Sequence, residues 1–138
     1  MTAKEYFDRM DELNRQIRLK LQRASFLRET LKNVTPVMES EQVSHTRNMH
    51  LMTDKISAIV DTEREADALV DELADMKNYL ITYIDQLTEA QESLFLKERY
   101  YDEKSTKQIA QTHSLSRRRV QQILENAIEH LDELLEKE

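Results

Sequence analysis

The chain has 138 residues, of which 39% are apolar, and it contains one proline, no glycine and no cysteine. Without glycine, β-hairpins and tight turns are disfavoured, so we expect an all-α protein. Disulfides and cysteine-ligated zinc are excluded, and no apolar run approaches the ~18 residues that span a bilayer. We therefore expect a cytoplasmic protein with no membrane partner.

Charge is segregated along the chain, although the net charge is −7. Lys and Arg number 9 against 7 Asp and Glu in residues 1–50, 3 against 11 in 51–96, 7 against 3 in 97–124, and 1 against 6 in 125–138. The short stretch 97–124 has the marked positive excess that is typical of a DNA-contacting element.

The first predicted element is a helix of roughly 30 residues that covers residues 3–34. Its apolar residues recur every seven positions, as in a coiled coil, and Lys20 interrupts one row. The lysine stem can lie along the seam while its ammonium stays in water. The two rows are Ala3, Met10, Ile17, Ala24 and Leu31, and Tyr6, Leu13, Leu27 and Val34.

The heptad is lost over residues 35–50, where Pro36 disfavours helical geometry at Thr35. We place a loop there, with room for a short helical turn at Glu39–Val43. The pattern then returns in a second long helix from near Leu51 to near Ala90. Its rows are Ile59, Ala66, Leu73, Leu80 and Leu87, and Thr62, Leu69, Met76, Tyr83 and Ala90, widened by Ile56, Val70 and Ile84.

These two helices can bury each other's apolar stripes as a coiled-coil-like antiparallel hairpin over residues 1–92. The first helix is mildly basic and the second strongly acidic, which favours their pairing. The same heptads also serve a homodimer through the long helices, either instead of the hairpin or in addition to it. The sequence leaves both arrangements open.

Residues 93–138 are predicted to form a helix-turn-helix domain. A dense apolar cluster at Leu94–Leu96, Tyr100 and Tyr101 needs a packing partner, and we interpret the tyrosines as core rather than base-stacking residues. Ser105 is the expected N-cap of a helix over 106–112, and Ser116 the expected N-cap of a final helix that begins at Arg117. The inward face of the final helix is Val120, Ile123, Leu124, Ala127, Ile128 and Leu131.

The opposite face of the final helix is centred on Arg118 and Gln122, and its flanks are Arg117, Arg119, Gln121 and Glu125. A guanidinium can pair bidentately with guanine, and a glutamine amide with adenine, so these two side chains are predicted to read base edges in double-stranded DNA. Positive charge at a helix N-terminus interacts unfavourably with the helix dipole. The three arginines that open this helix therefore suggest a functional reason for their presence. The other predicted DNA contacts are Ser105, Lys107, Ser114, Ser116, Arg117, Arg119 and Gln121.

Other kinds of site have little support. The histidines His45, His50, His113 and His130 lack the spacing of metal ligands, so no metal site is expected. There is no glycine-rich phosphate loop, no cysteine nucleophile and no recognisable catalytic pair. We therefore expect neither an enzyme nor a cofactor.

At the predicted helix-turn-helix the sequence resembles region 4 of the RNA polymerase sigma-70 family. The matching elements are Arg99-Tyr100, Ile109-Ala110, Leu115-Ser116, Arg117, Arg119-Val120, Gln122-Ile123, Ala127 and Leu131. The whole chain also resembles small helical proteins of phages and integrative elements of Gram-positive bacteria, which are similar in pattern to phage late-gene transcription activators. The resemblance implies a DNA-binding transcriptional regulator that acts at a promoter or operator and contacts the transcription machinery.

Three positions depart from the sigma pattern. Ser114 stands where a glycine is usual in the turn, Thr106 where an aromatic or leucine anchors the first helix, and Arg118 where an acidic residue begins the recognition helix. The promoter −35 sequence is therefore not the expected target. Because acidic stretches flank the basic one, an alternative function is a protein-interaction module that docks on RNA polymerase without touching DNA.

Overall fold

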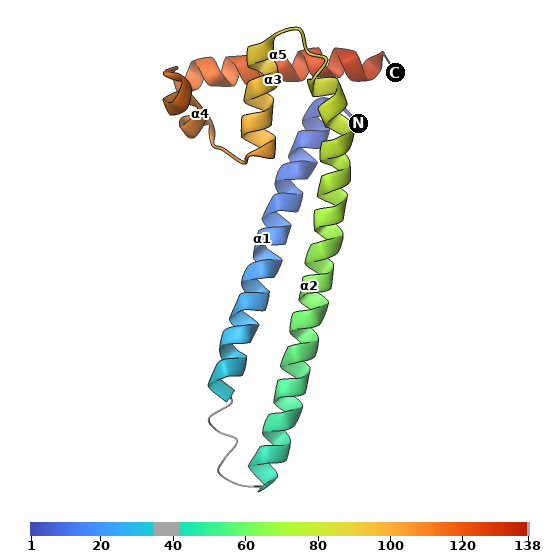
Figure 1. Cartoon of the computed structure of the whole chain (residues 1–138), viewed down its shortest axis with the longest axis vertical. Helices are drawn as coiled ribbons and strands as arrows, with labels where there is room; N and C mark the ends of the chain where they lie inside the picture. The colour runs from blue at the N-terminus through green and yellow to red at the C-terminus, as the bar shows by residue number, and fades with distance from the viewer. Residues whose placement is uncertain (35–41, 138) are drawn as a thin grey trace. The chain divides into compact units, whose positions relative to one another are not determined.

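The computed structural model describes residues 1–34 and 42–137, with side chains described for 1–32 and 49–137. Every regular element in these ranges is a helix, which confirms the all-α prediction (Figure 1). No helix in the described ranges combines the length and the apolar character needed to cross a membrane. The elements are α1 (Ala3–Val34), α2 (Gln42–Ile84), α3 (Ala90–Leu96), the π-helix η2 (Lys97–Tyr101), α4 (Thr106–His113) and α5 (Arg117–Glu136).

The predicted bounds are correct for α1 and wrong at both ends of α2. This helix begins at Gln42 instead of near Leu51 and ends at Ile84 instead of near Ala90. Residues 42–50 contain neither glycine nor proline, and lengthening a formed helix needs no new nucleus, so the helix continues where the heptad is lost. The rest of the predicted loop, with Pro36 and most of the turn proposed at Glu39–Val43, lies outside the described residues.

The chain forms two compact units. Unit 1 contains Met1–Glu12 and Leu73–Glu138, and unit 2 contains Leu13–Glu72. Each long helix therefore contributes to both units. The division into domains at residues 1–92 and 93–138 follows a different line and stays a prediction.

In unit 2, α1 and α2 pack antiparallel through the predicted apolar rows. Lys20 Nζ lies 2.7 Å from Glu65 Oε2, and Arg28 forms a second ion pair with Glu63. Pairing of the stripes within the chain is thus confirmed. Where side chains are described in this unit, the buried apolar residues are Leu13, Ala24, Ile59 and Ala66.

The seam in unit 2 is narrower than the sequence suggests. Ile56 and Val70, which were predicted to widen the stripe, are 47% and 45% exposed. Two helices in contact bury mainly the two heptad rows that face each other, so residues on the flanks of these rows stay outside.

Unit 1 joins the start of α1 to the C-terminal helices. Phe7 is 1% exposed and stacks on Tyr100, with ring centroids 4.1 Å apart and an angle of 13° between the planes. The Arg99 guanidinium lies 4.8 Å from the centre of the Tyr100 ring and 3.4 Å from the Asp11 carboxylate. The Tyr101 hydroxyl donates a hydrogen bond to the Lys77 carbonyl at 2.6 Å.

Both tyrosines therefore have packing partners inside unit 1, as the sequence predicts. Burial raises the pKa of Tyr100 and that of Tyr101. The prediction for Leu94 was wrong, because this residue is 45% exposed while its neighbours Phe95 and Leu96 are fully buried. A short helix has one inward face, and Phe95 and Leu96 occupy it.

A second link in unit 1 connects α1 with α5. The Asp132 Oδ1 atom accepts a hydrogen bond from the Ala3 amide at 2.5 Å. Amides in the first turn of a helix have no partner within the helix, and a carboxylate there also interacts favourably with the helix dipole. Asp132 thus anchors the first turn of α1 to α5.

A histidine–carboxylate pair links α3 to α5 and predicts a pH dependence of stability. His130 Nδ1 lies 2.6 and 2.7 Å from the two oxygens of Glu92, which is 6% exposed. This hydrogen bond raises the pKa of His130 above its ordinary 6.5. The His130–Glu92 pair therefore contributes fully to the free energy of unfolding below about pH 6.5. This contribution is lost as the pH rises through the higher pKa that His130 has in the folded state.

We expect the difference in free energy of unfolding between the wild type and His130→Gln to shrink as the pH rises from 6 to 8. Urea denaturation followed by circular dichroism at several pH values measures this difference. A difference that is constant across the range would contradict the prediction, because a neutral histidine would then contribute as much as a charged one.

Candidate nucleic-acid interface

The first helix of the helix-turn-helix, α4, begins with a capping box. Ser105 Oγ accepts a hydrogen bond from the Gln108 amide at 3.1 Å, and Gln108 Oε1 accepts one from the Ser105 amide at 2.9 Å. A Ser-x-x-Gln sequence supports both bonds, and each satisfies an amide that the helix leaves unpaired. The predicted N-cap is confirmed, and the helix ends at His113, one residue later than expected.

The turn between α4 and α5 is built around Ser114. Its backbone is left-handed, with φ 55° and ψ 42°, and the Leu115 amide donates to the Ala110 carbonyl at 2.9 Å. The Cβ of Ser114 therefore occupies a conformation that glycine adopts more easily. Ser116 follows as the N-cap of α5, with its Oγ accepting from the Arg119 amide at 3.1 Å, as predicted.

Ser114→Gly is expected to stabilise the protein by about 1 kcal/mol, because a residue with a Cβ pays roughly 1–2 kcal/mol in left-handed geometry and glycine loses part of that gain in chain entropy. Thermal or urea denaturation measures the change. Thr112→Gly is the matched control, since it places glycine inside α4 and should destabilise by up to about 1 kcal/mol. Destabilisation by both changes would contradict the interpretation of the turn.

One face of α5 is buried and the other is exposed. Val120 and Leu131 have no exposed surface, and Ile123, Leu124 and Ala127 are also buried. Ile128, which was predicted on the same face, is half-buried. The predicted reading face is exposed at all of its positions, which are Arg117, Arg118, Arg119, Gln121, Gln122 and Glu125.

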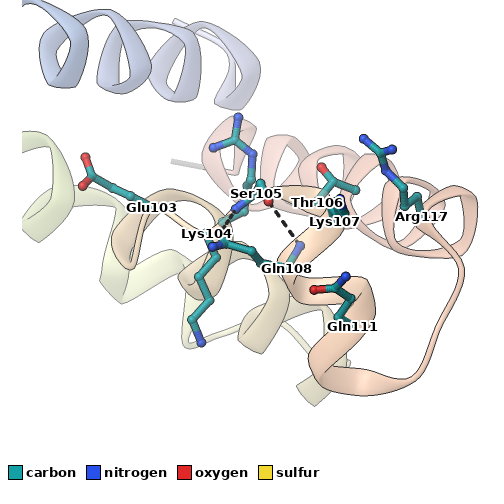
Figure 2. Close-up of a pocket in the computed structure, with 9 residues that line it drawn as sticks. Glu103, Lys104, Ser105, Thr106, Lys107, Gln108, Gln111 and Arg117 are labelled. Carbon is teal, nitrogen blue, oxygen red and sulfur yellow. Dashed lines mark hydrogen bonds between the residues drawn. The ribbon is translucent and has the colours of Figure 1, made fainter.

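A hollow of about 770 Å³ lies at the N-terminal ends of α4 and α5 and is rich in cationic side chains (Figure 2). It brings together three predicted contacts, Ser105, Lys107 and Arg117. Its other lining residues are Arg99, Glu103, Lys104, Thr106, Gln108 and Gln111.

Among these, Arg99 and Lys104 are cations that the sequence did not single out as contacts. Arg99 also pairs with Asp11, and Lys104 Nζ lies 3.6 Å from Glu98 Oε1. The only sequence signal for Arg99 and Lys104 is their position in the basic stretch 97–124. Which cations of this stretch lie on the same surface depends on the tertiary fold. Backbone amides, hydroxyls and cations converging at helix N-termini form a suitable environment for phosphate groups.

Arg119 lies elsewhere on the domain. It lines a second hollow, of about 240 Å³, together with Glu92, Asn126 and His130 among others. The structure therefore separates Arg119 from the hollow that contains Lys107 and Arg117. Ser114, Ser116, Arg118, Gln121 and Gln122 are exposed around the turn and the first turns of α5.

Comparison with known families agrees with this geometry. Residues 83–133 match the family model of sigma-70, region 4. This segment is a sigma-region-4-like helix-turn-helix. The match starts within the last turn of α2, so it extends further toward the N-terminus than the resemblance in the sequence suggests. Searches of the curated proteins and of the solved structures found no match.

Domains of this family bind DNA and contact RNA polymerase, and they are regulatory rather than catalytic. The helix-turn-helix of this chain is therefore consistent with a role in transcription regulation. Its capped α4, its left-handed turn and its exposed arginine and glutamine face supply the geometry that such a domain uses to present a recognition helix.

Proposed function

We propose that this protein is a DNA-binding transcriptional regulator of a phage or mobile element, acting in the cytoplasm and without catalytic activity. α5 enters the major groove of promoter or operator DNA. Arg118 and Gln122 read base edges, and the remaining predicted contacts, with Arg99 and Lys104, hold the sugar-phosphate backbone. The long helices serve self-association.

One observation carries this proposal. The N-terminal turns of α5 expose an arginine and glutamine face in a segment that matches sigma-70 region 4, beside a hollow lined by four cationic residues. Major-groove recognition requires such base-reading groups on the helix and phosphate contacts next to them. The mobile-element context follows from the resemblance of the whole chain to small phage proteins.

Selection from a randomised duplex library, followed by fluorescence anisotropy on the selected site, tests DNA binding. We expect a preferred site and an association constant that falls steeply with salt, since each neutralised phosphate releases counterions. No association at low ionic strength, or association that does not respond to salt, would overturn the proposal.

Lys107→Ala is expected to weaken binding to all duplexes equally and to lower the slope of log K against log salt by about 1, because it removes one phosphate contact without removing base readout. The matched control is Lys32→Ala, which deletes the same charge from a lysine of α1 that is 75% exposed. A change in sequence preference on Lys107→Ala would show instead that Lys107 reads bases.

A second function is a polymerase-docking adaptor that does not bind DNA. It is favoured by the acidic stretches on either side of the basic one, with 11 acidic residues in 51–96 and 6 in 125–138. Capture of purified RNA polymerase, together with no association with duplex DNA beyond a non-specific background that Arg117→Ala/Arg118→Ala/Arg119→Ala leaves unchanged, would support the adaptor.

A further inference from the structure

In the described part of unit 2, eight large apolar side chains stay exposed after the hairpin forms. Leu19, Phe26 and Leu51 lie on one flank of the hairpin, and the other five lie on the opposite flank. Their exposed fractions are 52% for Leu21, 52% for Met49, 47% for Ile56, 40% for Val60 and 45% for Val70. Their exposure is therefore too large for a role in the hairpin seam. We name this set the outer apolar face.

The heptad register places the outer apolar face on one flank of the hairpin. With Ala24, Ile59 and Ala66 at position a, Leu21, Met49, Ile56 and Val70 all occupy position e, and Val60 occupies the neighbouring position b. In an antiparallel pair the e positions of both helices border the same side of the seam. The ion pair between Arg28 and Glu63, which are both at position e, shows this arrangement directly.

The two helices of unit 2 carry opposite charge. Lys and Arg number 6 against 1 Asp or Glu in residues 13–32 of α1, and 2 against 7 in residues 49–72 of α2. A surface that fits this pattern presents an acidic helix to α1 and a basic helix to α2. A second copy of the same hairpin presents both.

We propose that the outer apolar face is a self-association surface and that its occupant is the same face of a second copy. The two hairpins pack about a two-fold axis parallel to their helices, so that α1 of each copy lies against α2 of the other. An axis perpendicular to the helices would place basic α1 against basic α1, which like charges disfavour. The proposal specifies the self-association suggested above and is independent of DNA binding.

This symmetry makes one contact predictable. Lys20 pairs with Glu65 within a hairpin, so Arg18 and Asp67 lie at about the same level along the helices. Both are exposed and at position b, beside the outer apolar face. A two-fold axis parallel to the helices preserves that level, so Arg18 of one copy meets Asp67 of the other, twice in each dimer.

Sedimentation equilibrium over a range of concentrations tests the surface. We expect the wild type to reach twice its monomer mass of 16.4 kDa. Ile56→Glu/Val60→Glu should raise the dimer dissociation constant by at least about 100-fold, since it places four charges in one apolar interface. Far-UV circular dichroism confirms that the helices remain folded.

The control variant is Leu19→Glu/Phe26→Glu, at residues that are 57% and 66% exposed and lie at position c, on the other flank of the hairpin. It should leave the dissociation constant unchanged. A monomeric wild type at 100 μM or so, or equal dissociation by the two variants, would overturn the proposal.

A charge exchange tests the symmetry. Arg18→Glu and Asp67→Arg should each weaken self-association several-fold, and an equimolar mixture of the two variants should recover wild-type association as a heterodimer. Because rescue requires one chain of each kind, a contact within one chain cannot produce it. A mixture that associates no better than its components would contradict the two-fold arrangement.

The same measurements separate this proposal from the DNA-binding one. Arg118→Ala should dimerise like the wild type, because Arg118 is in unit 1 and the surface is in unit 2. A dimer that fails to bind DNA would contradict only the proposed function. A monomer that binds DNA would contradict self-association, both here and in the proposed function, and would leave the proposed DNA binding standing.

Discussion

Replacing Arg118 with alanine is expected to remove discrimination at one base pair of the DNA site, with a loss of about 1–3 kcal/mol for the preferred base. The side chain is exposed, and the register of α5 places it at the centre of the face opposite the buried Val120 and Leu131. Binding to unrelated duplexes should weaken only by the loss of one positive charge, because phosphate contacts elsewhere persist.

Anisotropy titrations with the selected site and its single-base variants measure this discrimination. Arg118→Lys is the matched control, since it keeps the charge and lacks the planar fork that pairs with guanine. It should retain affinity for unrelated DNA and lose most of the base preference. If Arg118→Ala weakened every duplex equally, Arg118 would be a phosphate contact instead.

Phe7→Ala is expected to lower the free energy of unfolding by about 3–5 kcal/mol, the range for removing a buried phenylalanine ring. Phe7 is 1% exposed and stacks on Tyr100 of η2, so the change leaves a cavity between the start of α1 and the C-terminal helices. This is a large fraction of the 5–15 kcal/mol or so that a small domain has in total.

Urea denaturation followed by circular dichroism measures this loss. Phe26→Ala is the matched control in the same helix, since Phe26 is 66% exposed and its truncation should cost less than about 0.5 kcal/mol. At urea concentrations near the unfolding midpoint of Phe7→Ala, we also expect this variant to bind DNA more weakly than the wild type, because part of it is unfolded. Equal losses in the two variants would contradict the role of the Phe7–Tyr100 stack.

Local signals in the sequence were enough to predict α4 and α5. Ser105 and Ser116 cap these helices as their side-chain chemistry suggests, and the seven-residue rows of α1 give its bounds. These features depend on residues that lie within a few positions of one another. The resemblance to sigma region 4 also depended on this compact stretch.

Features that depend on tertiary packing were less predictable. Nothing local in the sequence indicates that Lys97–Tyr101 form a π-helix, or that Leu94 points outward while Phe95 is buried. The hollow that gathers Arg99 and Lys104 with Lys107 requires η2, α4 and α5 to be in place. The early start of α2 was missed because the heptad marks where a helix packs and not how far it extends.

Because Asp132 of α5 binds the Ala3 amide, α5 has two structural roles. Its first turn carries the arginines, and Asp132, roughly 20 Å further along the same continuous helix, holds the start of α1. α5 therefore joins the exposed arginine face to the start of α1 within unit 1.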